Sequence, residues 1–315
     1  MMFIFLIKRI FYSIPVLFII IIISFMLIHL IPGSPAAVIL GAEATKEQIL
    51  ALEHQLGLDE SITIQFFSYI KKIFTGDLGN SIFLLQPVMT CILNRINVTI
   101  SLAIPAMIFA ILFGISFGVL AAINQNKIID HIIMTLAITG VSIPSFWLAL
   151  NLMWMFGVKL KFLPVLGFVP ITQDFLQHIK HIILPVICIG FPQVGFIARM
   201  TRSSMLEVIR QNYMVTAKAK GLTMKTVIIK HGLKNAMLPI ITIIGMIFAI
   251  LLGGTVIIET VFNIQGLGSL FIVAIQRRDY PVVQGGVLFI GIIFVLMNLL
   301  VDILYAYFDP RIDYR

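Results

Sequence analysis

The residues of this chain that could do chemistry are few, and their spacing matches none of the common catalytic or metal-binding motifs. The sequence has no G-x-x-x-x-G-K-[ST] segment to hold the phosphates of ATP, and no H-E-x-x-H, C-x-x-C or G-x-S-x-G pattern. His178 and His181 are the only close pair of histidines, and such a pair is more typical of a membrane interface than of a metal site. We therefore expect no catalytic residue, no metal site and no ATPase activity in this chain.

Asp302 is the carboxylate that we expect inside an apolar span, with Asn298 one turn before it. A carboxylate within the membrane is a candidate for function, because a charge is costly there. The alternative, which we favour, is a position near the end of the span with a local partner. We expect no other carboxylate to be buried in the middle of a span. This argues against a proton-coupled carrier, which would be expected to contain several.

A basic segment between residues 199 and 234 carries the clearest pattern in the chain. It holds one acidic residue, Glu207, and eight basic residues: Arg199, Arg202, Arg210, Lys218, Lys220, Lys225, Lys230 and Lys234. Apolar residues from Met205 to Tyr213 recur at helical spacing, and Gly221 is suited to end a short helix. The small residues Thr216, Ala217 and Ala219 favour close packing against a partner over simple contact with lipid headgroups. The segment is therefore predicted to contain short helices that dock onto another protein.

The composition places this segment between membrane spans. Hydrophobic residues make up 60% of the 315 residues and charged residues 11%, whereas soluble domains carry roughly 25% charged residues. Apolar runs that could cross a bilayer are expected at residues 10–31, 99–123, 132–156, 179–198, 236–258 and 283–308. Pro144, Pro185 and Pro192 are expected to kink the third and fourth runs, and the Gly114–Gly118 pair would let a second helix approach closely. The predicted fold is all-α, a polytopic membrane protein with six transmembrane helices.

The charges of the loops predict the orientation of these spans. Basic residues gather on the cytoplasmic side of membrane proteins, so the 199–234 segment and both termini are placed in the cytoplasm. The net charge of +8 is explained by this bias and calls for no nucleic acid as a partner. The segment from residue 32 to residue 97 holds six acidic and four basic residues and is expected outside, where Thr45 should cap a helix that runs to about Leu58.

Three parts of the chain follow from this topology. Residues 1–98 are expected to contain the first transmembrane helix and an extracytoplasmic segment. Residues 99–308 are expected to form a core of five helices with a cytoplasmic loop at 199–235, and residues 309–315 a cytoplasmic tail.

Short motifs extend along nearly the whole chain. They are Gly76–Ser81, Ser142–Phe146, Tyr213, Thr216–Gly221, His231–Pro239, Gly266–Gly268, Arg278–Pro281, Val301–Tyr305 and Asp309–Arg311. Together they resemble the bacterial ABC importer permeases of the dipeptide/oligopeptide/nickel family, in which the basic segment is the EAA loop. Two residues depart from the commonest pattern: Val215 stands where the EAA motif opens with Glu, and Gln265 replaces the Pro often found before Gly266.

The resemblance implies the multi-pass permease subunit of a binding-protein-dependent importer in the bacterial inner membrane. It implies a related second permease subunit, two cytoplasmic ATPase subunits that bind ATP and Mg²⁺, and an extracytoplasmic binding protein, while this chain itself binds no cofactor. Coupling to the ATPase is expected at Tyr213, Thr216, Ala217, Lys218, Ala219, Lys220, Gly221 and Leu222, with Thr216, Ala217 and Gly221 on the docking surface. The outer gate or the contact with the binding protein is expected at Asp77, Gly79, Ser81, Gly266, Gly268 and Asp279.

The resemblance implies a short peptide as the cargo, and the absence of a His or Met cluster at ligand-like spacing along a predicted span favours peptide over metal. Import of nickel, of a metal chelate or of glutathione by the same machine remains open. From other classes, a secondary carrier would work without ATPase partners, and a membrane-embedded enzyme would need a catalytic constellation that the sequence lacks.

Overall fold

The computed structural model describes residues 2–30, 34–41 and 44–308, and the regular elements in these ranges are helices. They are α1 (Met2–Leu30), α2 (Pro35–Leu40), α3 (Lys46–Leu56), α4 (Ile62–Phe74), α5 (Val88–Ile123), α6 (Ile128–Ser142), α7 (Ser145–Leu152), the π-helix η1 (Met153–Lys159), α8 (Phe175–Ile209), α9 (Asn212–Ala219), α10 (Met224–Thr226), the π-helix η2 (Val227–Leu233), α11 (Lys234–Val261), α12 (Leu267–Gln276) and α13 (Tyr280–Phe308). The all-α prediction is confirmed. The predicted tail at 309–315 lies outside the described residues.

The chain packs as two compact units. Of the described residues, the first unit contains 98–268 together with the end segments 2–9 and 297–308, and the second contains those between 10 and 97 and between 269 and 296. Helices α1, α5, α12 and α13 each pass from one unit into the other. The three parts expected from the topology, with boundaries at residues 98 and 308, stay a prediction.

The membrane spans agree in number with the sequence prediction, but the third is not a single kinked helix. Within the described ranges, five helices are long and apolar enough to cross a bilayer, and α6 with the α7–η1 segment makes a sixth if the bent pair is one span. The two parts of that pair are bent by 101° between Ser142 and Ser145. Pro144 is the N-cap of α7, so the proline begins a new helix instead of bending one that continues.

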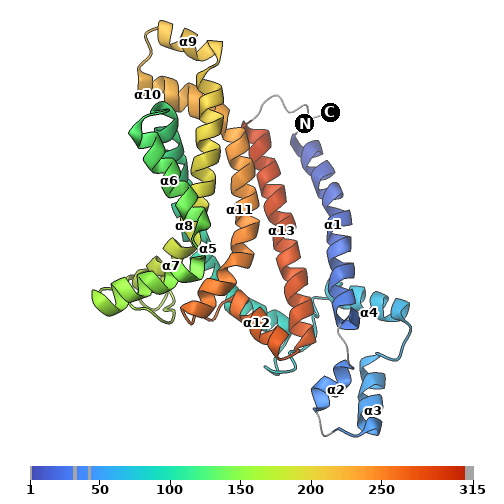
Figure 1. The fold of residues 1–315 in the computed structure, drawn as a ribbon. Helices are drawn as coiled ribbons and strands as arrows, with labels where there is room; N and C mark the ends of the chain where they lie inside the picture. The colour runs from blue at the N-terminus through green and yellow to red at the C-terminus, as the bar shows by residue number, and fades with distance from the viewer. Residues whose placement is uncertain (1, 31–33, 42–43, 309–315) are drawn as a thin grey trace. The chain divides into compact units, whose positions relative to one another are not determined.

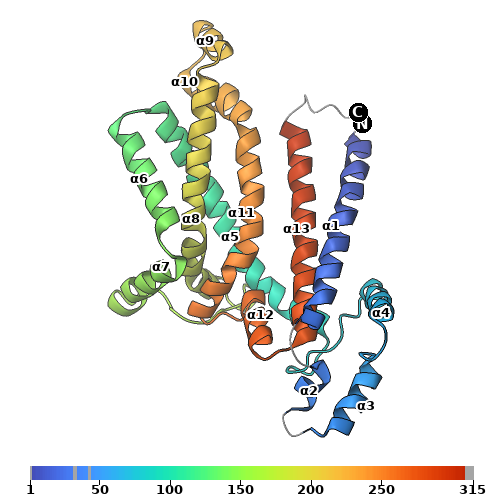
Figure 2. The same cartoon turned by 45° about the vertical axis from the view of Figure 1, so that its right-hand side comes forward.

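Helix α8 forms the centre of the first unit and packs against α5, α6 and α11 (Figure 1, Figure 2). Leu184, Cys188, Ile197 and Met205 along this helix are almost completely buried. Apolar side chains normally face lipid in a membrane helix, so this burial marks α8 as the helix that the others surround.

The predicted close approach at Gly114 and Gly118 is present, and α8 is the partner helix. A Cβ atom at Gly118 would lie 2.4 Å from Thr201 Cβ and 2.6 Å from the Ala198 carbonyl oxygen. A Cβ atom at Gly114 would lie 2.6 Å from Ile197 Cβ. Only glycine fits at these distances, so α5 and α8 are held together by backbone contact.

The second unit contains the predicted helix after Thr45. The Thr45 hydroxyl accepts from the Gln48 N–H, the Gln48 side chain accepts from the Thr45 N–H, and Gly57 ends α3 with a φ of +71°. Just beyond, the Asp59 carboxylate accepts a hydrogen bond from His54 at 2.6 Å, which raises the pKa of His54 and lowers that of Asp59.

Replacing Gly118 by Val should destabilise the protein by roughly 1–3 kcal/mol, because the new side chain forces α5 away from the Ala198 carbonyl group. The thermal unfolding temperature in detergent micelles measures the effect. Ser116→Val on the exposed face of the same helix is the control. Equal unfolding temperatures for the two variants would contradict the close approach.

Candidate functional site

The basic segment begins in the last turns of α8 and continues as three short helical pieces, α9, α10 and η2, that lead to α11. Helix α8 ends at Ile209, and Arg210 is its C-cap. Helix α9 begins two residues later, at Asn212, and ends at Ala219. Gly221 follows with a φ of +76°, a conformation that suits glycine, and Thr223 then caps α10. The prediction of a short helix that ends at Gly221 is confirmed. Figures 1 and 2 show α9 and α10 at the end of α8 that lies away from α7.

A small apolar cluster attaches α9 to the rest of the first unit. Met214 and Ala217 of α9 and Val227 of η2 are buried together, and Val208 and Ile209 at the end of α8 pack against them. The structure therefore places Ala217 on the inner face of α9, where it contacts its own chain and not solvent. Helix α9 is seated on α8 and η2 through this inner face.

The outer face of α9 and the turn that follows are exposed. The exposed residues among those predicted for coupling are Tyr213, Thr216, Lys218, Ala219, Lys220, Gly221 and Leu222. Val215 is 62% exposed and adds an apolar side chain to this face. A Cβ atom at Gly221 would have no atom within 4 Å, so the backbone there is open to an approaching surface. This face, which we call the α9 surface, mixes apolar, small and basic groups.

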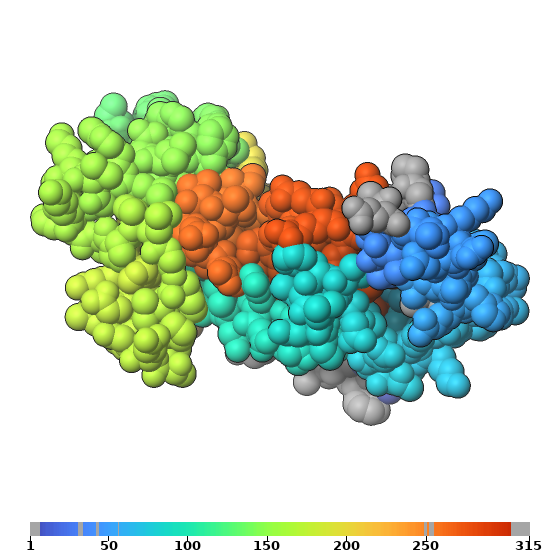
Figure 3. Space-filling view, turned by 90° about the horizontal axis from the view of Figure 1, so that it is seen from below, coloured from blue at the N-terminus to red at the C-terminus, as the bar shows by residue number. Residues whose placement is uncertain are grey.

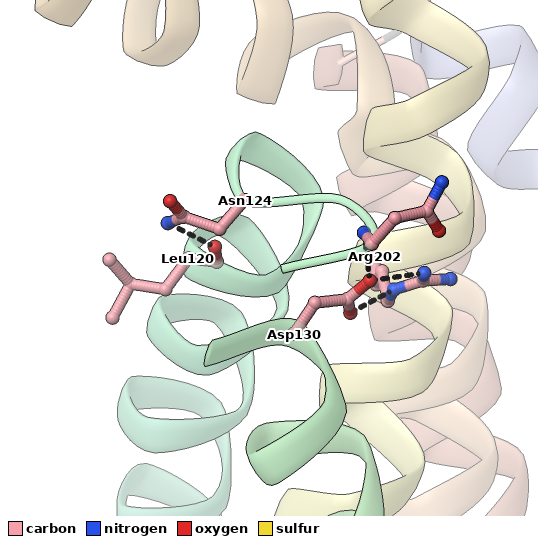
Figure 4. Close-up of polar contacts among 5 residues, drawn as sticks. Leu120, Asn124, Asp130 and Arg202 are labelled. Carbon is pink, nitrogen blue, oxygen red and sulfur yellow. Dashed lines mark hydrogen bonds and ion pairs between the residues drawn. The ribbon is translucent and has the colours of Figure 1, made fainter. Parts of the chain in front are cut away.

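A bidentate ion pair braces the same end of α8 (Figure 4). The Arg202 guanidinium donates from Nε to Asp130 Oδ1 at 2.6 Å and from Nη2 to Asp130 Oδ2 at 2.7 Å. The Asn126 N–H also donates to Oδ2, at 3.0 Å. The Asp130 side chain is only 2% exposed, so the start of α6 is fixed to α8 through a buried and fully hydrogen-bonded carboxylate.

The predicted outer residues fall into two clusters, one in each unit. In the second unit, the Asp279 carboxylate is buried and accepts from the Ser81 hydroxyl at 2.5 Å and from the N–H groups of Ile82 and Phe83 at 3.1 Å. Figure 3 shows the teal segment that contains residues 77–90 against the orange residues that lead to this aspartate. Asp77 accepts from the Gly79 N–H at 2.8 Å in the turn that precedes Ser81.

In the first unit, Gly266 and Gly268 lie against a second buried carboxylate. Glu259, near the end of α11, is 0% exposed and accepts from the Thr99 hydroxyl at 2.7 Å, and that hydroxyl in turn accepts from the Leu267 N–H at 2.8 Å. A Cβ atom at Gly266 would collide with the Glu259 carboxylate. The turn after α11 can therefore close over Glu259 only because a glycine stands there.

The expectation that no carboxylate other than Asp302 is buried in the middle of a span stays a prediction, but the structure buries two further carboxylates near helix ends. Glu259 lies in the last turn of α11, which continues past Ile258 to Val261. Asp130 lies in the first turn of α6, which begins at Ile128. Asp302 itself forms an ion pair with Arg9 at 3.0 Å, which agrees with the local partner that we favoured.

Sequence reasoning missed both Asp130 and Glu259 as buried polar centres. Asp130 and its partner Arg202 are 72 residues apart, and no local pattern connects them. Glu259 directly follows the apolar run that hydropathy assigns to the fifth span. This position is the sequence signal that could have identified it as a buried carboxylate.

The break between α6 and α7 borders a cavity of about 230 Å³ in the first unit. Ser145, Cys188 and Gln193 are among its lining residues. Within the described part of the chain, the buried Oε1 atom of Gln193 has no hydrogen-bond partner. In the same described ranges, no three His, Cys, Asp or Glu side chains gather where they could hold a metal ion.

Comparisons with known proteins give a consistent result. Residues 114–314 match the family model described as "Binding-protein-dependent transport system inner membrane component", and residues 2–103 match the model for the N-terminal part of such membrane components. The dipeptide transport system permease protein of Alkalihalophilus pseudofirmus is 44% identical, and the glutathione transport system permease protein of Salmonella choleraesuis is 42% identical, each alignment covering 98% of both chains. A chain of the MetNI methionine ABC transporter, solved in inward-facing conformations, has the same fold, with a TM-score of 0.56 and 18% identity over 70% of this chain and 97% of that chain.

Replacing Asp130 by Asn should lower the stability by roughly 3 kcal/mol, because Arg202 loses its charged partner in a mostly buried place. Chemical unfolding in detergent micelles measures the change. Glu207→Gln removes an exposed carboxylate from α8 and is the matched control. The pairing would be refuted if the two variants unfolded alike. The double variant Asp130→Asn, Arg202→Gln should recover part of the loss.

Proposed function

Because this chain belongs to the family of binding-protein-dependent transport system inner membrane components, we propose that its α9 surface couples an ATPase to the transport pathway. The chain is a multi-pass protein of the bacterial inner membrane and the permease component of an ABC importer.

The observation that carries the proposal is the two-sided construction of α9. Its inner face is fixed to α8 and η2 by Met214, Ala217 and Val227. Its outer face leaves Thr216 and the open backbone at Gly221 exposed. A helix that is packed against its own chain on one side and exposed on the other can contact an ATPase and transmit the displacement of that ATPase to α8. Among the residues predicted for docking, Thr216 and Gly221 make the contact and Ala217 holds the helix in place.

In the proposed mechanism, two ATPase subunits bind ATP and Mg²⁺ in the cytoplasm and close on one another. Each of two related permease subunits rests on one ATPase through its α9 surface and moves with it. Helix α8 carries the displacement because the Asp130–Arg202 pair and the contacts at Gly114 and Gly118 tie it to α6 and α5. Rigid-body motion of packed helices is the usual route to alternating access.

The basic groups on the α9 surface suit an acidic partner. Lys218 and Lys220 are exposed beside Gly221 and are free to meet carboxylates of an ATPase or the phosphates of lipid headgroups. This placement requires the basic segment and both termini to be cytoplasmic, as the charge bias of the loops indicates.

The two outer clusters are proposed to face the binding protein. The buried carboxylates of Asp279 and Glu259 fix the turns that contain Ser81 and Gly266, so these turns form shaped surfaces. Asp77, Gly79 and Gly268 belong to the same turns or border them. A binding protein that delivers cargo needs a surface of this kind, or an outer gate that it can open.

The proposed cargo is a short peptide. The two relatives with 42–44% identity are named for dipeptide and glutathione transport, and glutathione is itself a modified peptide. Nickel or a metal chelate is the alternative cargo. The ligand that the partner binding protein holds, identified by mass spectrometry, distinguishes these substrates.

Replacing Gly221 by Asp should uncouple ATP hydrolysis from uptake, since it adds bulk and negative charge to the α9 surface. The backbone cost of a non-glycine residue there is roughly 1–2 kcal/mol and leaves the fold intact. The measurement is cargo uptake and ATP hydrolysis in proteoliposomes that contain both permease subunits and the ATPases.

Gly57→Asp is the matched control, because Gly57 also ends a short helix with a φ of +71° but lies far from α9 in sequence and in the other unit. We expect uptake to fall at least tenfold for Gly221→Asp and to change little for Gly57→Asp. Normal uptake together with normal copurification of the ATPase in the Gly221 variant would refute the coupling role.

A further inference from the structure

Helix α4 in the second unit has an apolar face that the described residues of this unit leave exposed. Phe67 is 70% exposed and Phe74 is 84% exposed. They are seven residues apart, which places them on one side of the helix, and Lys71 lies between them on the same side. Two exposed phenylalanines with a lysine between them are unusual on a surface that faces only water.

The opposite side of α4 packs on the membrane span α1. The Phe66 ring lies 5.2 Å from the Phe25 ring, and the Tyr69 hydroxyl is hydrogen-bonded to the Ser24 hydroxyl at 2.8 Å. The Gln65 side chain meets His29 at 3.1 Å. These contacts fix the level of α4 along α1, and Figures 1 and 2 show α4 lying across α1 near the end that leads to α2.

That level can be compared with the bilayer. The apolar span of α1 is Ile7–Leu30, and its 24 residues are about 36 Å long, slightly more than the roughly 30 Å of a hydrocarbon core. The α1 residues that contact α4, from Ser24 to His29, lie one to six residues before Leu30, or about 2–9 Å inside the end of the span. Helices that lie in the membrane interface are immersed about 5–10 Å at the boundary between headgroups and acyl chains.

We propose that α4 is an interfacial helix whose Phe67–Phe74 face is immersed among the lipid headgroups and upper acyl chains. On α1, Ile19 and Ile23 close to the α4 contacts are also about half exposed. Lys71 can extend its ammonium group toward the lipid phosphates while its methylene chain stays beside the rings.

This immersion gives α4 a mechanical role in the second unit. Helix α4 leads directly into the turn that contains Asp77 and Ser81, and Thr75 caps its end. A helix held at a fixed depth sets the height at which this turn stands above the membrane. The lipid contact is independent of the coupling role of α9, so either can fail without the other.

The test is the depth of single spin labels in nanodiscs of phosphatidylcholine and phosphatidylglycerol, with the full importer assembled. Cys91 and Cys188 are replaced by Ala, and single cysteines are introduced at Phe67 or Phe74. Glu47→Cys on α3 is the control for an exposed site in the same unit. Collision of each label with oxygen reports contact with lipid, and collision with a water-soluble nickel chelate reports contact with water.

We expect the labels at positions 67 and 74 to collide with oxygen several-fold more, and with the nickel chelate several-fold less, than the label at position 47. High collision with the nickel chelate at both positions would place the face in water and overturn the proposal. Low collision with both reagents would show that a protein covers the face, which also overturns it. If one variant fails to accumulate, the other gives the same readout.

Discussion

The pairing of Asp130 with Arg202 is the contact on which the arrangement of the first unit depends. A carboxylate that is 2% exposed is stable only when its charge and its hydrogen bonds are satisfied, and here the guanidinium and the Asn126 N–H satisfy both oxygens. Because the pair joins the first turn of α6 to α8, it fixes the end of α8 from which α9 projects. The docking of α9 on Val208 and Ile209 builds on a helix end that is already held.

The packing along α8 extends this constraint through the unit. Glycine contacts bring α5 against Ile197, Ala198 and Thr201, and a further glycine, Gly195, brings α8 against the Ala137 carbonyl group of α6. Helices in contact through their backbones have little room to slide or tilt separately. A displacement applied at α9 is therefore transmitted along α8 to the helices packed against it. At the other end of α6, the chain changes direction at the break before α7.

Much of this architecture could be predicted from the sequence, because local physics determines it. The apolar runs predicted the spans, the Thr45 cap predicted α3, and Gly221 predicted the end of α9. Pro144 marked the right position in the third span, but its local preference for extended backbone could not reveal a bend of 101°, which depends on how α7 packs.

The parts that sequence reasoning missed involve long-range contacts. Asp130 finds its partner 72 residues away, and Glu259 finds Thr99 160 residues away. Ala217 illustrates a different difficulty: a small residue fits either face of a helix, and its inward placement followed only from the contacts of Met214 and Val227. The roles assigned to the predicted coupling and outer residues stay predictions until they are measured.

The central claim is that α9 and α8 move as one body. The most direct measurement uses electron–electron distances between spin labels in the assembled importer, with and without ATP. One pair joins Val215 on α9 to Gln177 at the far end of α8, and the other joins Val215 to a label on the second permease subunit. Both labelled positions in this chain are exposed. We predict that the distance within the chain stays constant while the distance between the subunits changes. A change within the chain as large as the change between subunits would contradict the account.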